Sequence, residues 1–371
     1  MVLFILILTF LILIHELGHF IVARLCKVKI EEFGIGIPPK AFTLFHWKGI
    51  PITFNWLLLG GFVRMEGEDT LQTPIEKGAG NQKRQFFPFY QRPLWQKLAV
   101  VLAGPGVNII FGMVVFSTLF SLYGIPQEVS IPPTITAVAQ NSPASTAGIQ
   151  ENDEVKAISK KDGTDEKQIT SVAEIITYIN AHRGETVSMT ILREGTTQKI
   201  DVYARKTEEI PQNEGTIGVG LTDQKFTTKF YPGIEQPIRG TLYGVQKSIE
   251  FGGTILSSLG GIGQSLFAGK VPGDVAGPVG IAHAVQKEDL FANGWATGFN
   301  FAALLSINLG VMNLLPIPAL DGGRIVLLIL EKFIKHKKFE KLSQNLNQFG
   351  FLFLIGLLIL ITVKDVIGLL R

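Results

Sequence analysis

Three ionisable side chains, His15, Glu16 and His19, lie within the apolar sequence LILIHELGHFIVAR. Residues four apart share one face of a helix, so His15 and His19 can reach one metal ion. Neutral imidazoles are zinc ligands, and the adjacent Glu16 can take a proton from water that the metal activates. The spacing therefore predicts a zinc hydrolase site. The alternative, a pair of packed core histidines, is disfavoured because ionisable groups are costly to bury in a membrane segment.

A catalytic zinc ion uses three protein ligands and keeps one position open. The best candidate for the third ligand is Asp321 in MNLLPIPALDGGR. Pro316 and Pro318 precede it and interrupt regular helix, while Gly322 and Gly323 follow it and relax the backbone. Considered alone, Asp321 also fits the N-cap of a helix. Together with the histidine pair, it is predicted to be a ligand.

The composition indicates that much of the chain lies in lipid. Of 371 residues, 46% are hydrophobic and 18% are charged, with a mean hydropathy of +0.31. The net charge of +3 gives no electrostatic footprint for a nucleic-acid partner. The single cysteine, Cys26, excludes an intramolecular disulfide and any multi-cysteine metal cluster. A metal must therefore be held by histidines and carboxylates.

Four apolar stretches are long enough to cross a bilayer as helices. They are residues 2–25, 98–123, 294–315 and 349–369. The first lacks a basic leader and a cleavage site, so we expect it to be retained. Basic residues cluster between the first and second stretches and after the third, which places both segments in the cytoplasm by the positive-inside rule. Both termini and the long segment after Tyr123 are then expected outside.

The outer segment contains short β-rich runs, such as TITAVA and TVSMTILREG, around a predicted helix, SVAEIITYINAH. Ser171 and Glu174 have capping-box spacing at the start of that helix. The piece NSPASTAGIQENDEVKAIS resembles bacterial PDZ domains, with Gly148 and Asp153 at the turn into a strand. PDZ domains bind extended peptides at a sheet edge, so this module predicts peptide recognition. The alternative is a β-rich spacer that binds nothing.

Five motifs, in order, resemble the site-two protease family of intramembrane zinc metalloproteases, particularly its RseP/RasP-type bacterial branch. They are HELGHF, GGFVRMEGED at 60–69, AGPGVN at 103–108, GPVGIA at 277–282 and NLLPIPALDGG. The resemblance covers nearly the whole chain. It implies a polytopic α-helical membrane protein with about four transmembrane helices, a membrane-associated β-structure and an extracytoplasmic PDZ-like domain. The gammaproteobacterial type carries two PDZ domains, whereas this chain has one recognisable copy.

The resemblance also implies residue roles. His15, His19 and Asp321 correspond to the ligands of one Zn²⁺ ion, and Glu16 corresponds to the general base. The residues expected to shape the site or to handle the substrate strand are Asn313, Pro316, Pro318 and Asn108. The implied activity is regulated cleavage of single-span membrane proteins, such as anti-sigma factors or remnant signal peptides. The implied location is the bacterial cytoplasmic (inner) membrane, with the active site toward the cytoplasm.

The predicted segments are the first transmembrane helix 1–28, a β region 29–97, the second helix 98–124, the PDZ-like domain 125–222, a linker 223–290 and the last two helices 291–371. In the family, the segment equivalent to the strand-like residues 29–66 lies near the active site, so we expect these residues to pair with an unwound substrate. The alternative is a peripheral anchor, with Trp47 and Trp56 at the membrane interface. In the linker, residues 238–269 favour an amphipathic gate helix or a plain linker helix.

Two functions from other classes remain as alternatives. The first is a membrane-anchored PDZ scaffold with a structural metal and no cleavage, which would leave Glu16 without a purpose. The second is a metal transporter, whose ionisable residues should trace a path across several spans. In this chain, the predicted ligands cluster at one depth.

Overall fold

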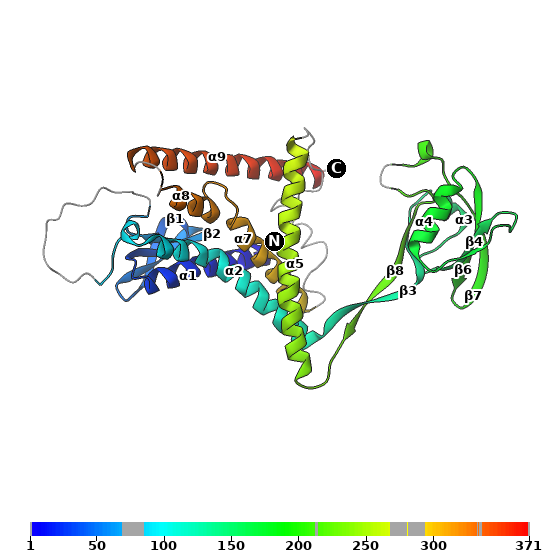
Figure 1. Cartoon of the computed structure of the whole chain (residues 1–371), viewed down its shortest axis with the longest axis horizontal. Coiled ribbons are helices and arrows are strands. Elements are labelled where there is room, and N and C mark those ends of the chain that lie inside the picture. The colour runs from blue at the N-terminus through cyan, green and yellow to red at the C-terminus, as the bar shows by residue number, and fades with distance from the viewer. Residues whose placement is uncertain are drawn as a thin grey trace. The chain divides into compact units, whose positions relative to one another are not determined.

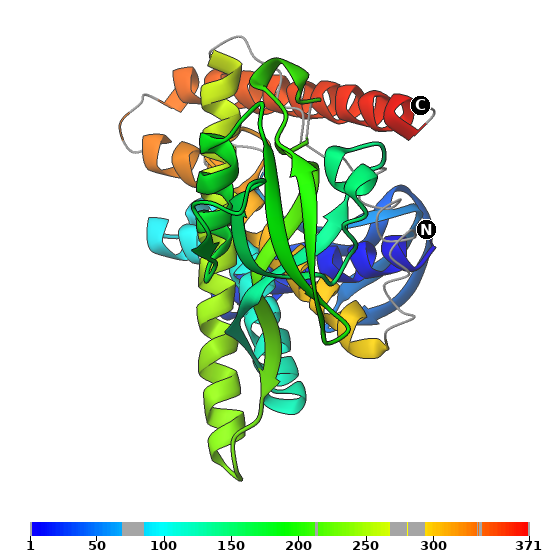
Figure 2. The ribbon, with the colours of Figure 1, turned by 90° about the vertical axis from the view of Figure 1, so that its right-hand side faces the viewer.

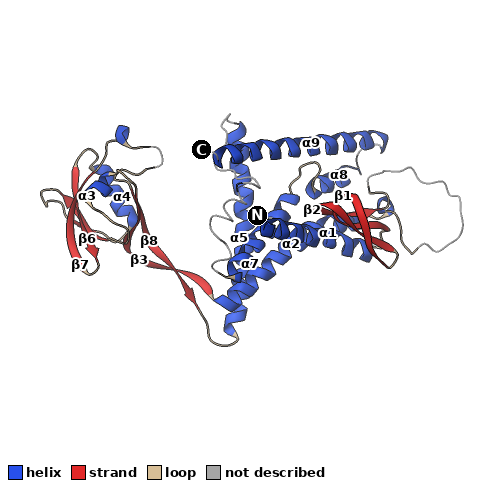
Figure 3. Cartoon of the chain, turned by 180° about the vertical axis from the view of Figure 1, so that it is seen from behind, coloured by secondary structure: helices blue, strands red, loops and turns tan. Residues whose placement is uncertain are grey.

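The computed structural model describes residues 2–68, 85–211, 214–267, 280, 294–331, 333 and 336–369. The chain forms two compact units (Figure 1). The first consists of Met1–Tyr123 and Tyr231–Arg371, and the second is Gly124–Phe230. Helices dominate the described part of the first unit, whereas strands dominate the second (Figure 3).

The first unit contains the four described helices that are long and apolar enough to cross a membrane. Its helices are α1 (Val2–Leu25), α2 (Leu94–Tyr123), α5 (Glu235–Phe267), α7 (Trp295–Asn313), α8 (Asp321–Glu331) and α9 (His336–Leu369). The candidate spans are Leu3–Leu25, Leu94–Tyr123, Trp295–Asn313 and Gln348–Ile367. Helix α9 begins 13 residues before the predicted stretch 349–369, since helical hydrogen bonding continues through a polar segment that hydropathy does not mark.

Small residues bring the helices that carry the candidate site close together. A Cβ added at Gly18 on α1 would lie 2.5 Å from the Ala103 carbonyl oxygen on α2. A Cβ at Gly310 on α7 would lie 2.8 Å from the Pro105 carbonyl oxygen. Close backbone approach at small residues is typical of helix packing in membranes. Helix α2 is thereby held between α1 and α7.

Helix α5 falls within the predicted linker and includes most of the segment 238–269. Ser117 and Ser121 on α2 donate hydrogen bonds to the carbonyls of Thr241 and Pro237 on α5, each at 3.2 Å. Helix α5 is therefore packed against α2 in this structure. The motif GPVGIA lies outside the described residues except for Gly280, whose backbone N–H donates to Asp365 at 2.8 Å.

The predicted β region contains two long antiparallel strands, β1 (Ile30–Trp47) and β2 (Ile50–Met65). A short 3₁₀ helix, Phe89–Gln91, follows. The strands bend on themselves, so residues 33–35 of β1 pair with residues 52–54 on one side and with residues 61–63 on the other. The last part of β2 is therefore an edge of this small sheet.

The second unit, which faces the viewer in Figure 2, is an antiparallel sheet. Its strand order is β7-β6-β4-β3-β8, and β5 pairs with β4. Its elements are β3 (Ile125–Val138), α3 (Pro143–Ala147), β4 (Glu154–Lys160), β5 (Lys167–Gln168), α4 (Val172–Ala181), β6 (Thr186–Arg193), β7 (Thr196–Tyr203), a 3₁₀ helix (Thr207–Glu209) and β8 (Val219–Lys229). Helix α4 starts as predicted, and Glu174 accepts the Ser171 backbone N–H at 3.3 Å. Strand β8 extends beyond residue 222, the predicted end of the PDZ-like domain, because it pairs with β3 as far as Ile125.

Asp153 fixes the turn before β4. It is fully buried and accepts two 2.7 Å hydrogen bonds from the Arg193 guanidinium and one of 2.8 Å from the Gln150 backbone N–H. Burial acts to raise the pKa of Asp153, but these hydrogen bonds outweigh it, and the pKa lies below its ordinary value. The turn that the sequence analysis singled out is thus held by an ion pair between a buried carboxylate and a partly exposed guanidinium.

We expect Asp153→Asn to destabilise the second unit by about 1–3 kcal/mol at neutral pH, because the variant removes the negative charge and one of the two oxygens that accept from Arg193. A carboxyl group whose pKa is lowered by folding stabilises the fold at pH values above its ordinary pKa of about 4. This stabilisation is lost as the pH falls through the pKa of the folded state. The difference between native and variant should therefore shrink in acid. Hydrogen exchange of residues 124–230 in the full chain, corrected for intrinsic rates, measures it. A difference that acidification leaves unchanged would contradict this assignment.

Candidate metal centre and its cavity

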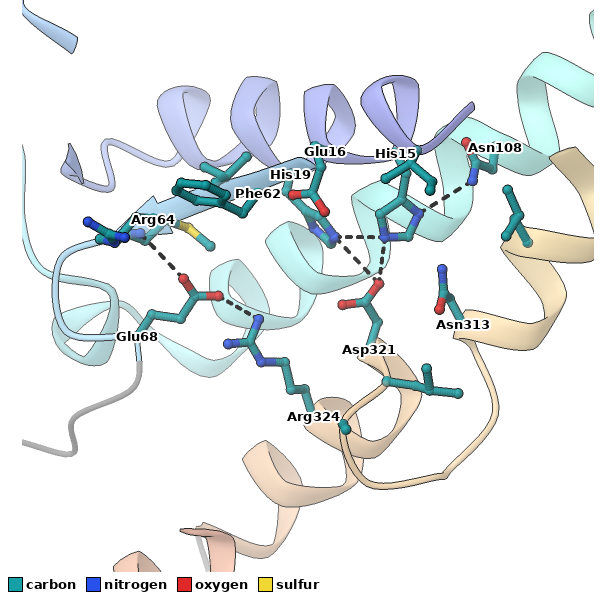
Figure 4. A pocket seen from close by; sticks show the side chains of 16 residues that line it. His15, Glu16, His19, Phe62, Arg64, Glu68, Asn108, Asn313, Asp321 and Arg324 are labelled. Atoms are coloured by element: carbon teal, nitrogen blue, oxygen red, sulfur yellow. Dashed lines mark hydrogen bonds and ion pairs between the residues drawn. The ribbon is translucent and has the colours of Figure 1, made fainter. Parts of the chain in front are cut away.

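His15, His19 and Asp321 come together at one point in the first unit, where α1 faces the start of α8 (Figure 4). The two histidine Nε2 atoms are 3.1 Å apart. Asp321 Oδ2 lies 2.9 Å from His15 Nε2 and 3.4 Å from His19 Nε2. Ligand atoms about 2.0–2.1 Å from a tetrahedral zinc ion are about 3.3 Å from one another. The three atoms are therefore spaced like one face of a zinc tetrahedron.

Helix α2 packs against the two histidines of this cluster. His19 Nδ1 lies 2.8 Å from the Val100 carbonyl oxygen, which can only accept, so Nδ1 donates. The Nε2 atom of neutral His19 then directs a lone pair at the centre of the cluster. A Cβ added at Gly104 would come within 2.7 Å of the Nε2 atoms of both histidines. The glycine thus leaves open the space beside both nitrogens, and the donor set suits a zinc ion.

The cluster opens into a cavity of about 490 Å³. Glu16, Asn108 and Asn313 line it together with the three cluster residues (Figure 4). The other lining residues are Ile12, Phe62, Val63, Arg64, Met65, Glu68, Leu309, Ala319, Leu320 and Arg324. Five of these, Phe62 to Met65 and Glu68, belong to the end of β2 and the turn that follows it. The cavity thus extends from the ionisable cluster to the end of β2.

Two of the predicted supporting residues do not line the cavity. Pro316 and Pro318 lie in the loop between α7 and α8, where Pro316 is exposed. Pro318 packs beside Gly350 of α9, where a Cβ would lie 2.5 Å from the Pro318 Cβ. These prolines shape the loop that leads to Asp321. Their role in shaping the site or handling the substrate strand stays a prediction.

Gly322 and Gly323 were predicted to relax the backbone after Asp321, and this prediction was wrong. Both residues are helical, in the first turn of α8, and neither has a positive φ angle. A Cβ at Gly322 would clash with the carbonyl oxygen of Leu314, and one at Gly323 with that of Ile317. The glycines therefore provide space for the loop to fold tightly against α8.

One ion pair at the cavity was not predicted. Arg324, one turn after Asp321 on α8, pairs with Glu68 at 2.5 Å. Glu68 also accepts the Met65 backbone N–H at 3.3 Å. This pair connects the helix that carries Asp321 to the end of β2. The motif GGFVRMEGED contained Glu68, but no local spacing relates it to a residue 256 positions away.

The model of a family described as peptidase family M50 matches residues 3–357. A Clostridium acetobutylicum protein named "putative zinc metalloprotease" is 32% identical, and the match covers 96% of this chain and 94% of the relative. Proteins with similar names from Agrobacterium fabrum and Staphylococcus aureus are 28% and 25% identical. These matches cover 98% of this chain and 94% and 97% of the relatives, respectively.

Proposed function

The chain belongs to peptidase family M50, the site-two protease family of zinc metallopeptidases, and we propose that it cleaves single-span membrane proteins within the bilayer. One observation carries the proposal. Two histidines from an apolar helix and an aspartate 302 positions after the second one meet at a cavity that Glu16 also lines. Ionisable side chains in a membrane helix are costly and need a partner, and a metal ion would be a partner for both histidines.

In the proposed mechanism, His15, His19 and Asp321 hold the zinc ion. When bound, zinc supplies Lewis-acid chemistry, which makes water nucleophilic and polarises the substrate carbonyl. Glu16 accepts the proton of the attacking water and then donates it to the leaving nitrogen. Asn313 lines the cavity at the end of α7, where it can contact the substrate backbone.

The test is cleavage of a panel of purified single-span proteins in bilayers by the zinc-loaded chain. The panel includes versions already shortened outside the membrane, such as those left by another protease. We expect zinc-dependent cleavage of at least one member. A chain that retains zinc and cleaves none of them, shortened versions included, would favour the scaffold instead.

We further propose that the edge of β2 binds the unwound substrate. A helix in lipid has its peptide groups bonded internally, so a segment unwound for cleavage needs other partners. The Glu66 N–H donates to the Lys29 carbonyl on the β1 side, whereas the Met65 N–H turns to the Glu68 carboxylate. The backbone N–H groups of successive strand residues point alternately to the two sides of the strand. We therefore infer that the N–H of Val63, like that of Met65, points away from β1.

We expect Val63→Pro to reduce cleavage by up to about tenfold, because proline removes one outward donor and a hydrogen bond contributes about 0.5–1.5 kcal/mol. Proline is tolerated where an edge strand faces away from its ladder, so zinc content should be unchanged. Val63→Ala is the matched control, since it shortens the same buried side chain but keeps the N–H. Initial cleavage rates and zinc content are the measurements. Equal rates for the two variants would rule out this pairing.

The second unit is proposed to be a PDZ-like domain that binds peptide. A cavity of about 370 Å³ lies between α4 and the segment that leads into β8. Ile176 and Ile179 on one side and Ile217, Val219 and Leu221 on the other give it apolar walls. Strand β8 is at the edge of the sheet, where an extended peptide can add as a further strand.

The chain is a multi-pass membrane protein, and its orientation is a proposal from charge. The basic loops after the first and third spans place these segments in the cytoplasm of a bacterial inner membrane. The termini and the PDZ-like domain then lie outside, and the active site faces the cytoplasmic side. The proposed domain order is that of the sequence, with the PDZ-like boundary moved to Phe230.

A further inference from the structure

One face of α2 lies against the histidine pair between Val100 and Asn108. Val100, Gly104 and Asn108 are spaced four apart, so they share a helix face. The Val100 carbonyl contacts His19, Gly104 faces both histidines, and Asn108 lies beside His15 (Figure 4). Val100 and Asn108 therefore each place a polar group beside the Nδ1 atom of one histidine.

The hydrogen bonds around Asn108 do not balance in the orientation drawn. Asn108 is fully buried, and its Nδ2 lies 3.4 Å from His15 Nδ1. The Oδ1 atom of the same amide is also buried and has no hydrogen-bond partner. A buried acceptor without a partner costs about 1–3 kcal/mol. The two amide orientations fill nearly the same volume, so the hydrogen bonds decide between them.

The role proposed above for His15 decides which orientation balances. A histidine that binds a metal through Nε2 carries its proton on Nδ1, and that proton needs an acceptor. The Asn108 nitrogen is a donor and cannot serve. Turning the amide by 180° brings Oδ1 to His15 Nδ1, so that the oxygen accepts the Nδ1 proton, and moves Nδ2 to the position that Oδ1 held.

We propose that Asn108 is a positioning residue whose amide oxygen accepts the Nδ1 proton of His15 and so keeps the His15 Nε2 lone pair directed at zinc. The Val100 carbonyl does the same for His19. Ser306 on α7 donates to the Asn108 carbonyl oxygen at 2.8 Å and is itself fully buried, which fixes the backbone at this point. Helix α2 thus supplies an acceptor to each histidine ligand. This inference rests on the proposed role of His15 as a metal ligand.

The test is the zinc affinity of the full chain, measured by competition with a chelator, for Asn108→Asp and Asn108→Leu. Aspartate keeps an acceptor of the same shape but has no donor, so its affinity should equal or exceed that of the native chain. Leucine keeps the volume but has no acceptor, so its affinity should fall about 10–100-fold. A role in packing alone predicts the reverse order, with leucine tolerated and a buried carboxylate harmful.

Leucine at the native affinity, or aspartate as weak as leucine, would overturn the inference. If either variant fails to fold, nitrogen-15 NMR of histidine-labelled native chain with zinc tests the protonated Nδ1 that the inference requires. His15 Nδ1 should carry a directly bonded proton, and an unprotonated Nδ1 would overturn the inference. A native chain that binds no zinc would instead refute the proposed site as a whole, so the two failures are distinguishable.

Discussion

Replacing Glu16 with glutamine should reduce peptide cleavage by about 10²–10⁴-fold and leave the zinc content unchanged. The amide has almost the shape of the carboxylate but cannot take a proton from water. Glu16 lines the cavity without belonging to the group of three ligand atoms, so its loss should not release the ion. Cleavage of a single-span substrate and metal analysis of the same preparation measure both quantities.

Glu31→Gln is the matched control, because Glu31 is an exposed carboxylate on β1 outside the cavity. It should cleave at the native rate. A Glu16→Gln variant that loses zinc together with activity would make Glu16 a ligand. A variant that cleaves at the native rate would require another base.

Gly104→Ala should remove zinc and with it nearly all activity. The added Cβ would come within 2.7 Å of both histidine Nε2 atoms, closer than carbon and nitrogen atoms can pack. The histidines or α2 must shift to relieve this contact, and a shift of about 1 Å at a catalytic site can cost about 100-fold in rate. Overpacking should also destabilise the fold by about 1–3 kcal/mol.

Gly106 provides the control for this experiment. It lies on the same helix two positions away, and a Cβ there would meet nothing within 4 Å. Gly106→Ala should therefore bind zinc and cleave as the native chain does, with equal or slightly higher stability. Zinc content and thermal unfolding of both variants check the pair. A Gly104→Ala variant that keeps native zinc affinity would show that the space beside the histidines is not needed.

The sequence was most informative where a pattern is local. The spacing of His15 and His19 determines a shared helix face, and long apolar runs mark spans, so both predictions could be made without a fold. Asp321 is 302 positions from His19, and its selection depended on chemistry and on the resemblance, which spacing alone could not supply. The structure brings its carboxylate to the histidines.

Contacts between distant segments could not be predicted in this way. The pairing of Arg324 with Glu68 and the approach of Gly104 to the histidines depend on how helices and strands pack in three dimensions. The role of Gly322 was misread for the same reason, since the carbonyl that it avoids belongs to a loop whose path the sequence does not specify. Asn108 was singled out by its motif, but its partner became visible only with His15 beside it.

The position of the cut tests the central claim most directly. A single-span substrate, reconstituted in bilayers with the zinc-loaded native chain, is cleaved, and the masses of both products identify the peptide bond. We predict that the cleaved bond lies within the apolar span. With Glu16→Gln in place of the native chain, neither product of this cut should form. Cleavage confined to the soluble flanks, or products that are the same with both chains, would contradict proteolysis within the membrane at this site.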